Sequence, residues 1–312
     1  MTPLVSVCMP AYNAGAWIAE AIESVLAQTL EDFELVVSDN NSTDDTAAIA
    51  RSFDDPRVRV STVSPKVGAV ENHNRSVHLS RGRYVKFLHA DDALLPTCLE
   101  EMTAAAQEDE RIGIVFAPRR VKLEGEDVEW VEEFARAHEH FDELQRVNDG
   151  LPLFRQLLAS RLERNWVGEP SNVLATRACL EEVGLFNPHL FQIADFELWL
   201  RAMLRFRIAF LDHELTVYRH HSASVTAKNA RVGRDWLDRL WLYQGLLADP
   251  ALPGPERAQV RRLRDAALRR AVFRSQPRRL SQRRFNGDLP DYLAYLMRPA
   301  GKRPLLYEPL DG

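Results

Sequence analysis

The chain has 312 residues, of which 46% are hydrophobic and 27% charged, and this globular balance excludes an intrinsically disordered protein. Its net charge of -5 excludes a protein that binds nucleic acid through an overall positive charge. No stretch approaches the roughly 18 apolar residues of a membrane span. The first residues also lack the basic and then apolar pattern of a secretory signal.

Cysteine and glycine spacing removes further classes of protein. The cysteines Cys8, Cys98 and Cys179 are far apart and form no CxxC pair, so we expect buried thiols and a reducing, cytoplasmic compartment. No two glycines are closer than Gly245 and Gly254. This spacing excludes a GxGxxG dinucleotide fingerprint, a GxxxxGK[ST] phosphate loop and a GxSxG nucleophile elbow.

Strand and helix patterns alternate over the first ~120 residues. Apolar runs predict strands over 4–9, 33–37, 58–63 and 84–88. Helical spacing, such as Ile18, Ile22, Val25 and Leu26 on one face, predicts helices over 18–26, 44–53, 72–79 and 96–106. This alternation predicts an α/β fold with a mostly parallel central sheet and helices on both faces.

The rest of the chain divides into three parts. Residues 119–150 are rich in acidic side chains and predict a surface excursion or a helix. Short strands are predicted over 207–211 and 215–218. We therefore expect a first domain over 1–222, with halves at about 1–118 and 119–222, followed by a helical, Arg-rich C-terminal extension over 223–312.

The extension is basic from Glu256 onward, and its arginines alternate with apolar residues. One interpretation is a basic amphipathic helix that contacts an anionic membrane surface at the inner face of the membrane. The alternative is a helix that packs on the acidic remainder of the chain or mediates homo-oligomer formation. The sequence leaves both open.

Polar residues follow the predicted strands, and ligands bind beyond the carboxyl ends of the strands in open parallel sheets. The first strand leads into 10–13, the second into 38–42 and the fourth into 89–92; further carboxylates lie at 194–199. With no phosphate loop present, several carboxylates at one edge predict a hard divalent cation, Mg²⁺ or Mn²⁺, that bridges to substrate phosphates.

These segments resemble the family 2 inverting glycosyltransferases, which have the GT-A fold and use nucleotide-diphosphate sugars. The resemblance rests on 5–13, 33–46 and 82–92, and continues through 182–186, 195–201 and 218–221. It covers roughly residues 4–222. By this resemblance we expect a sugar to move from a nucleotide-diphosphate donor, expected to be UDP-linked, to a glycan or lipid-linked acceptor in bacterial surface polysaccharide or glycan synthesis.

The resemblance implies a nucleotide site at the first two strand ends. Asp39 is similar to the aspartate that hydrogen-bonds the base, and Asn40 and Ser42 would shape its turn. The loop that resembles the one against the base and ribose comprises Pro10, Ala11, Tyr12 and Asn13.

The resemblance also implies a metal and diphosphate site. Asp91 is similar to the metal-binding last aspartate of the DxD motif, with Asp92 as its neighbour. The first carboxylate of that motif is replaced by His89. Either this histidine touches the ribose or diphosphate, or the cation is held more weakly than in the family. His221 matches a late histidine that joins the metal or diphosphate site in some members.

Asp195 is similar to the family's catalytic base, although the Glu-Asp segment reads Ala-Asp here, and Glu197 is the alternative base. The base would deprotonate an acceptor hydroxyl that displaces the diphosphate with inversion. By the same resemblance, the residues expected to face the acceptor are Trp166, Glu169, Ser171 and Glu197. Two other functions compete with this one: a nucleotidyltransferase of similar fold, which would release pyrophosphate, and a non-catalytic nucleotide-sugar-binding module.

Overall fold

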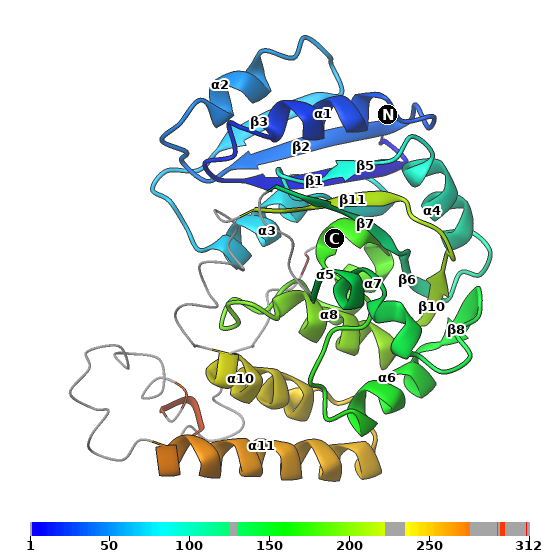
Figure 1. The fold of residues 1–312 in the computed structure, drawn as a ribbon, viewed down its shortest axis with the longest axis vertical. Helices are drawn as coiled ribbons and strands as arrows, with labels where there is room; N and C mark the ends of the chain where they lie inside the picture. Colours follow the sequence, from blue (N-terminus) through cyan, green and yellow to red (C-terminus); the bar gives the residue numbers. More distant parts are fainter. Residues whose placement is uncertain are drawn as a thin grey trace.

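The computed structural model describes residues 2–124, 130–221, 235–274, 292, 294–296 and 310. Within these residues, eight strands form one sheet in the order β3-β2-β1-β4-β9-β6-β10-β8 (Figure 1). Their bounds are β1 Val5–Ala11, β2 Phe33–Asp39, β3 Val58–Thr62, β4 Tyr84–Phe87, β6 Ile112–Phe116, β8 Val147–Asp149, β9 Val173–Thr176 and β10 Arg207–Phe210.

Helices connect and cover these strands. Those of the first half are α1 Ile18–Leu26, α2 Thr46–Arg51, α3 Ala69–His78 and α4 Cys98–Ala106. Those that follow are α5 Trp130–Ala135, α6 Gly150–Ala159, α7 Arg177–Val183, α8 Ala194–Met203, α10 Asp235–Ala248 and α11 Gly254–Arg274, with 3₁₀ turns η1 Ala137–His140 and η2 Pro170–Asn172. The predicted α/β architecture with helices and a mostly parallel sheet is confirmed.

The strands β3, β2, β1 and β4 run parallel, as predicted. A helix lies between each strand and the next along the chain, and it returns the chain to the end of the sheet where the strands begin. The strand β9 was not predicted. It lies between β4 and β6 and is antiparallel to both. Its four residues are too few for a periodic pattern to distinguish them from a loop.

A second, three-stranded sheet has the order β5-β11-β7, with β5 at Ala93–Leu94, β7 at Arg119–Leu123 and β11 at Thr216–His220. The prediction of a surface excursion or helix at the start of 119–150 was incomplete. Residues 119–123 instead pair in parallel with β11. That pairing links segments about 100 residues apart, which local sequence does not reveal, and it brings the end of β11 beside the loop after β4.

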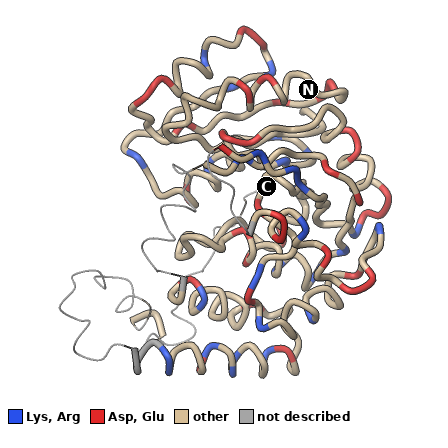
Figure 2. Tube along the Cα trace, in the orientation of Figure 1, with Lys and Arg blue, Asp and Glu red and all other residues tan. Residues whose placement is uncertain are grey.

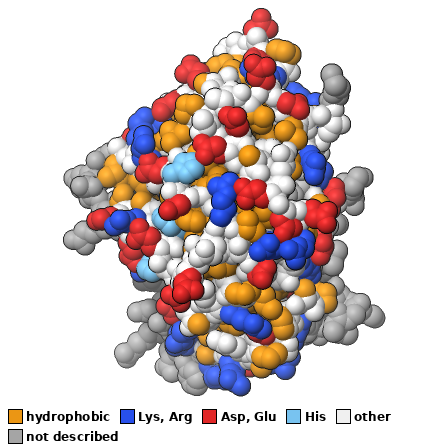
Figure 3. All heavy atoms as spheres, turned by 90° about the vertical axis from the view of Figure 1, so that its right-hand side faces the viewer, with side chains coloured by type: hydrophobic (Ala, Val, Ile, Leu, Met, Phe, Trp, Pro, Cys, Tyr) orange, Lys and Arg blue, Asp and Glu red, His pale blue; other side chains and the backbone are white. Residues whose placement is uncertain are grey.

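The helix α10 packs against α8, and α11 packs against α10 and α6. Apolar side chains of α10, such as Leu240 and Leu246, share one buried cluster with Trp199 of α8, and Val260 of α11 belongs to the same cluster. Figure 2 shows basic residues along α11, and acidic and basic side chains are interspersed over the face in Figure 3. The helix α11 therefore packs within the chain, and most of the basic segment that follows it lies outside the described residues.

The sequence predicts neither a membrane span nor a disulfide. None of the helices in the described part of the chain is both long enough and apolar enough to cross a membrane. Cys8, Cys98 and Cys179 are free thiols buried in the two cores. Burial raises the pKa of Cys8 and Cys179 to about 12 and that of Cys98 to about 11, so they pack as small apolar side chains.

Candidate active site

The loops after β1 and β2 are held together by side chains of the predicted nucleotide site. Asn13 adopts a positive φ of 51°, a conformation that asparagine tolerates better than most residues. Its backbone N–H donates to Ser42 Oγ at 3.0 Å, and its Oδ1 accepts from the backbone N–H of Thr43 at 2.9 Å. Asp39 is buried, and its Oδ1 accepts from the backbone N–H of Ser42 at 3.3 Å. Hydrogen bonds between side chains and backbone therefore hold the two loops against each other.

Other predicted residues of the loops after β1 and β2 either form hydrogen bonds that hold the backbone or remain exposed to solvent. The backbone N–H of Asn40 donates to the carbonyl of Ala11 at 2.8 Å, and the Asn40 amide pairs with both backbone groups of Val67. Tyr12 is the exposed member, at 43%, and the ammonium of Lys66 lies 3.3 Å from its ring centroid. The structure therefore leaves Tyr12 available to a ligand, whereas Asn40 shapes the backbone.

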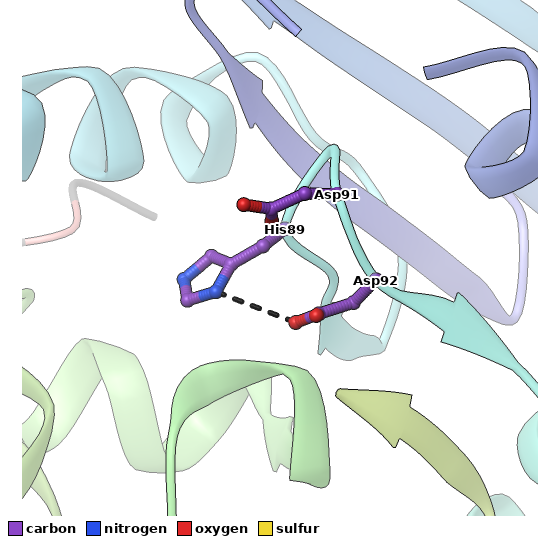
Figure 4. Close-up of side chains that lie close together, drawn as sticks. All are labelled: His89, Asp91 and Asp92. Carbon is purple, nitrogen blue, oxygen red and sulfur yellow. Dashed lines mark ion pairs between the residues drawn. The ribbon is translucent and has the colours of Figure 1, made fainter. Parts of the chain in front are cut away.

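The loop after β4 carries His89, Asp91 and Asp92, whose potential ligand atoms lie within 4.8 Å of one another. Figure 4 shows His89 and Asp92 turned toward each other, with His89 Nδ1 3.5 Å from Asp92 Oδ2. His89 Nε2 lies 3.2 Å from His73 Nε2 of α3. Both ring nitrogens of His89 are thus engaged by protein groups.

The ionisation of these groups follows from burial and from their neighbours. Burial acts against a charged His89, but Asp92 outweighs it and raises the pKa of His89 to about 9. Burial lowers the pKa of His73 to about 4, so His73 is neutral and its Nε2 can accept a hydrogen bond from the N–H of His89. Burial also opposes ionised Asp91, yet His221 and His89 hold its pKa below the usual value. A positive His89 and a negative Asp91 result at neutral pH.

Asp92 has a structural place in this loop. It is 2% exposed, and its two oxygens accept from Ser171 Oγ at 2.5 Å and from the backbone N–H of Arg219 at 2.9 Å. Ser171 is fully buried and also accepts from the backbone N–H of His89 at 3.0 Å. Asp92 and Ser171 therefore hold the loop in place, and Ser171 does not face solvent as an acceptor-binding residue would.

His221, the residue that follows β11, lies beside Asp91. Its Nε2 lies 3.1 Å from Asp91 Oδ2, and its ring stacks on Trp17 at 4.0 Å. Arg219 of the same strand is 3% exposed, donates to the carbonyl of Asp91 at 2.8 Å and also pairs with Glu20 and Glu124. This network positions both members of the predicted metal pair.

The chemistry of these donors fits a hard divalent cation. The Asp91 side chain keeps 30% exposure, so one carboxylate remains accessible beside the ring of His221. His221 Nε2 lies 3.1 Å from Asp91 Oδ2, a separation at which both atoms could bind the same cation. The residues that could hold a cation are therefore Asp91 and His221, with Asp92 behind them, whereas His89 is held as a cation itself.

Asp195 lies in the first turn of α8 and is half-buried. Burial raises its pKa to about 7, although a helix N-terminus favours the ionised form. The charge of Glu169 also raises the pKa of Asp195, whereas the charge of His89 lowers it. Asp195 and His89 of the loop after β4 therefore influence each other electrostatically.

The remaining residues expected to face the acceptor differ in their burial and in their partners. Glu169 is 11% exposed and pairs with Arg119 at 2.5 Å, and Trp166 is half-buried against Phe141 at a centroid distance of 5.1 Å. Glu197 is fully buried and forms a two-point ion pair with Arg201, each contact at 3.0 Å. Since Glu197 points into the core beside α10, its expected role at the acceptor, and its alternative role as base, do not agree with the structure.

Sequence reasoning did not identify Asn165, Arg119, Arg219 or Trp17. Asn165 Nδ2 donates to Asp195 Oδ2 at 3.2 Å and to the carbonyl of Gly168 at 2.8 Å. All of these residues act through contacts between segments that are remote in the sequence. The one local signal is Gly168, whose φ of 111° and close contact with Arg119 require glycine.

Comparison with known proteins agrees with this geometry. Residues 6–165 match Glycosyl transferase family 2. An uncharacterized protein of Mycobacterium tuberculosis is 38% identical over 256 residues, which are 82% of this chain and 79% of that protein.

Two solved structures are similar in fold. Staphylococcus aureus TarS 1-349 in complex with UDP-GlcNAc has a TM-score of 0.64 at 19% identity, covering 98% of this chain and 78% of that one. The mannosyltransferase PcManGT of Pyrobaculum calidifontis, in complex with GDP-Man and Mn²⁺, has a TM-score of 0.55 at 17% identity, covering 96% and 83%.

The sheet, with its polar loops at the carboxyl ends of β1, β2 and β4, is therefore a GT-A fold. The chain belongs to glycosyl transferase family 2. This membership confirms the family expected from the strand-end motifs.

Proposed function

We propose that the chain is an inverting glycosyltransferase that moves a sugar from a nucleoside-diphosphate sugar, with UDP as the expected nucleotide, to an acceptor hydroxyl. One observation carries the proposal: Asp195, a half-buried carboxylate in the first turn of α8 with a pKa of about 7, is held at Oδ2 by the amide of Asn165 at 3.2 Å. A base with a pKa near the working pH is suited to removing a hydroxyl proton during attack.

In this mechanism each group has a separate task. Asp195 takes the proton of the acceptor hydroxyl as its oxygen attacks the anomeric carbon, and the nucleoside diphosphate leaves from the opposite face of the sugar, which inverts the configuration. Asn165 keeps the base oriented through its bond to Oδ2. The positive charge of His89 acts near the leaving group, where it stabilises the charge that develops.

We further propose that the reaction uses Mg²⁺ or Mn²⁺. A cation bound through Asp91 and His221 would neutralise the diphosphate as it leaves. The accessible carboxylate of Asp91 and the 3.1 Å separation between Asp91 Oδ2 and His221 Nε2 support the assignment. Mn²⁺ in the structure of the mannosyltransferase adds support from a protein of similar fold.

The nucleotide and the acceptor are part of the same proposal. The complex of TarS with UDP-GlcNAc favours a UDP-linked donor. Because PcManGT binds GDP-Man, GDP-linked sugars are the donors to compare with UDP-linked ones. A glycan or lipid-linked acceptor is proposed. Exposed arginines of α11 suit an anionic membrane surface where a lipid-linked acceptor would lie: Arg261, Arg262, Arg269 and Arg270.

The decisive experiment incubates the chain with UDP- and GDP-sugars, with Mn²⁺, Mg²⁺ or a chelator, and measures which small product appears. Release of nucleoside diphosphate supports the glycosyltransferase, and the anomeric configuration of the product, read by NMR, tests inversion. Release of pyrophosphate would indicate a nucleotidyltransferase. Nucleotide-sugar binding without either product would indicate a binding module.

The membrane part of the proposal has its own test. Sedimentation with vesicles containing anionic lipid, at low and high salt, should recover the protein with the vesicles only at low salt. Recovery in the supernatant at both salt concentrations would contradict a membrane role for the basic extension.

A further inference from the structure

The helix α10 lies outside the sheet, yet one of its side chains holds the segment that leads to the candidate base. Asp238 is 3% exposed. Its carboxylate accepts from the backbone N–H of Gln192 at 2.6 Å and from that of Phe191 at 3.1 Å. These two residues lie immediately before Ile193, the N-cap of α8, whose first turn carries Asp195. A buried carboxylate that accepts from two successive amides fixes both the position and the direction of that turn.

The next residue of α10 holds the other segment beside the base. The guanidinium of Arg239 donates to the carbonyls of Leu162 and Glu163. Leu162 has a φ of 57° and Arg161 one of 64°, values that are unfavourable for residues other than glycine. Such backbone persists where surrounding contacts over-determine it. Arg239 supplies such contacts three residues before Asn165, whose amide binds Asp195.

We propose that α10 is a positioning element for the base, with Asp238 and Arg239 as its positioning residues. Asp238 sets the start of α8, and Arg239 sets the loop that carries Asn165, so two adjacent side chains determine both sides of the contact between Asn165 and Asp195. Neither touches the substrate in this proposal. The inference rests on the proposed function, in which Asp195 is the base.

The effect should appear in the chemical step and leave donor binding unchanged. The predicted nucleotide site is built from the loops after β1, β2 and β4, and none of the contacts described for Asp238 or Arg239 reaches those loops. Misplacing a catalytic group by about 1 Å can cost on the order of 10²-fold in rate. We therefore expect a lower kcat with an unchanged donor KM.

The test compares Asp238→Asn and Arg239→Met with the wild-type full chain. Each variant should lower kcat for sugar transfer by about 10- to 100-fold, leave the Kd for nucleoside diphosphate unchanged, and shift the base-dependent limb of the pH–rate profile. The matched control is Asp265→Asn on α11, the same chemical change at a residue that pairs with Arg264. This control should behave as wild type.

The outcomes separate the inference from the function on which it rests. Folded variants with a wild-type kcat and pH profile would overturn the positioning role, as would a parallel loss of transfer and nucleotide binding, which marks a general structural role. If Asp238→Asn or Arg239→Met fails to fold by circular dichroism, Arg239→Lys, which keeps one donor group and the charge, decides by the same criteria. A wild-type chain that releases no nucleoside diphosphate would overturn the proposed function itself.

Discussion

The side-chain amide of Asn165 lies 3.2 Å from Asp195 Oδ2, and the same amide is fixed by three further hydrogen bonds to Val167 and Gly168. Asn165 is therefore held in one orientation before it meets the carboxylate. Its N–H group stabilises the ionised form of Asp195, which burial otherwise disfavours.

Replacing Asn165 by Ala should lower kcat for transfer by about 10-fold and raise the pKa of Asp195. The pKa of Asp195 should rise because the lost N–H donor favoured the charged carboxylate. A pH–rate profile should show its rising limb displaced to higher pH. An Asn165→Ala enzyme with the wild-type limb would contradict this role for Asn165.

The activity of the wild-type chain should rise with pH and level off above about pH 7. Asp195 must be deprotonated to act as a base, and its pKa is about 7. Asp195→Asn should abolish transfer and the limb together while it keeps nucleoside diphosphate binding, since the amide preserves the shape but accepts no proton. Transfer by Asp195→Asn at more than a small fraction of the wild-type rate would remove Asp195 from this role.

Asp91 and Asp92 should respond differently to the same substitution. Asp91→Asn should lose metal-dependent turnover with little change in Tm, because its side chain remains 30% exposed. Asp92→Asn should lower Tm, because both of its buried oxygens accept hydrogen bonds. Metal titration of activity and thermal unfolding of both variants would check this contrast, and normal metal dependence in Asp91→Asn would count against the assignment.

Glu197→Gln should destabilise the fold by about 3–5 kcal/mol, because it leaves the fully buried guanidinium of Arg201 without its carboxylate partner. Urea unfolding measures the loss. Any fall in activity should track the folded fraction, with no selective change in acceptor KM. A stable Glu197→Gln protein that has lost transfer would instead make Glu197 the base.

Much of the fold could be predicted from local sequence. The strands β1 to β4 are short apolar runs, and the helices between them have continuous apolar faces, so periodicity alone predicts their type and alternation. The candidate site residues at their carboxyl ends follow from the rule that parallel strands present ligands at one edge. This rule predicts Asp91 and Tyr12 as candidate site residues, and the side chains of both remain accessible to a ligand.

What the sequence determined by itself was thus the parallel half of the sheet and the chemical character of its edge, because both depend on neighbouring residues. Only the tertiary structure decided which of the two carboxylates, Asp195 or Glu197, is buried in the core. The two residues are separated by a single position on α8, and packing against α10 buries Glu197 with Arg201 and leaves Asp195 beside Asn165. Burial and the partners from remote segments set which carboxylate can exchange a proton, and no local pattern encodes those contacts.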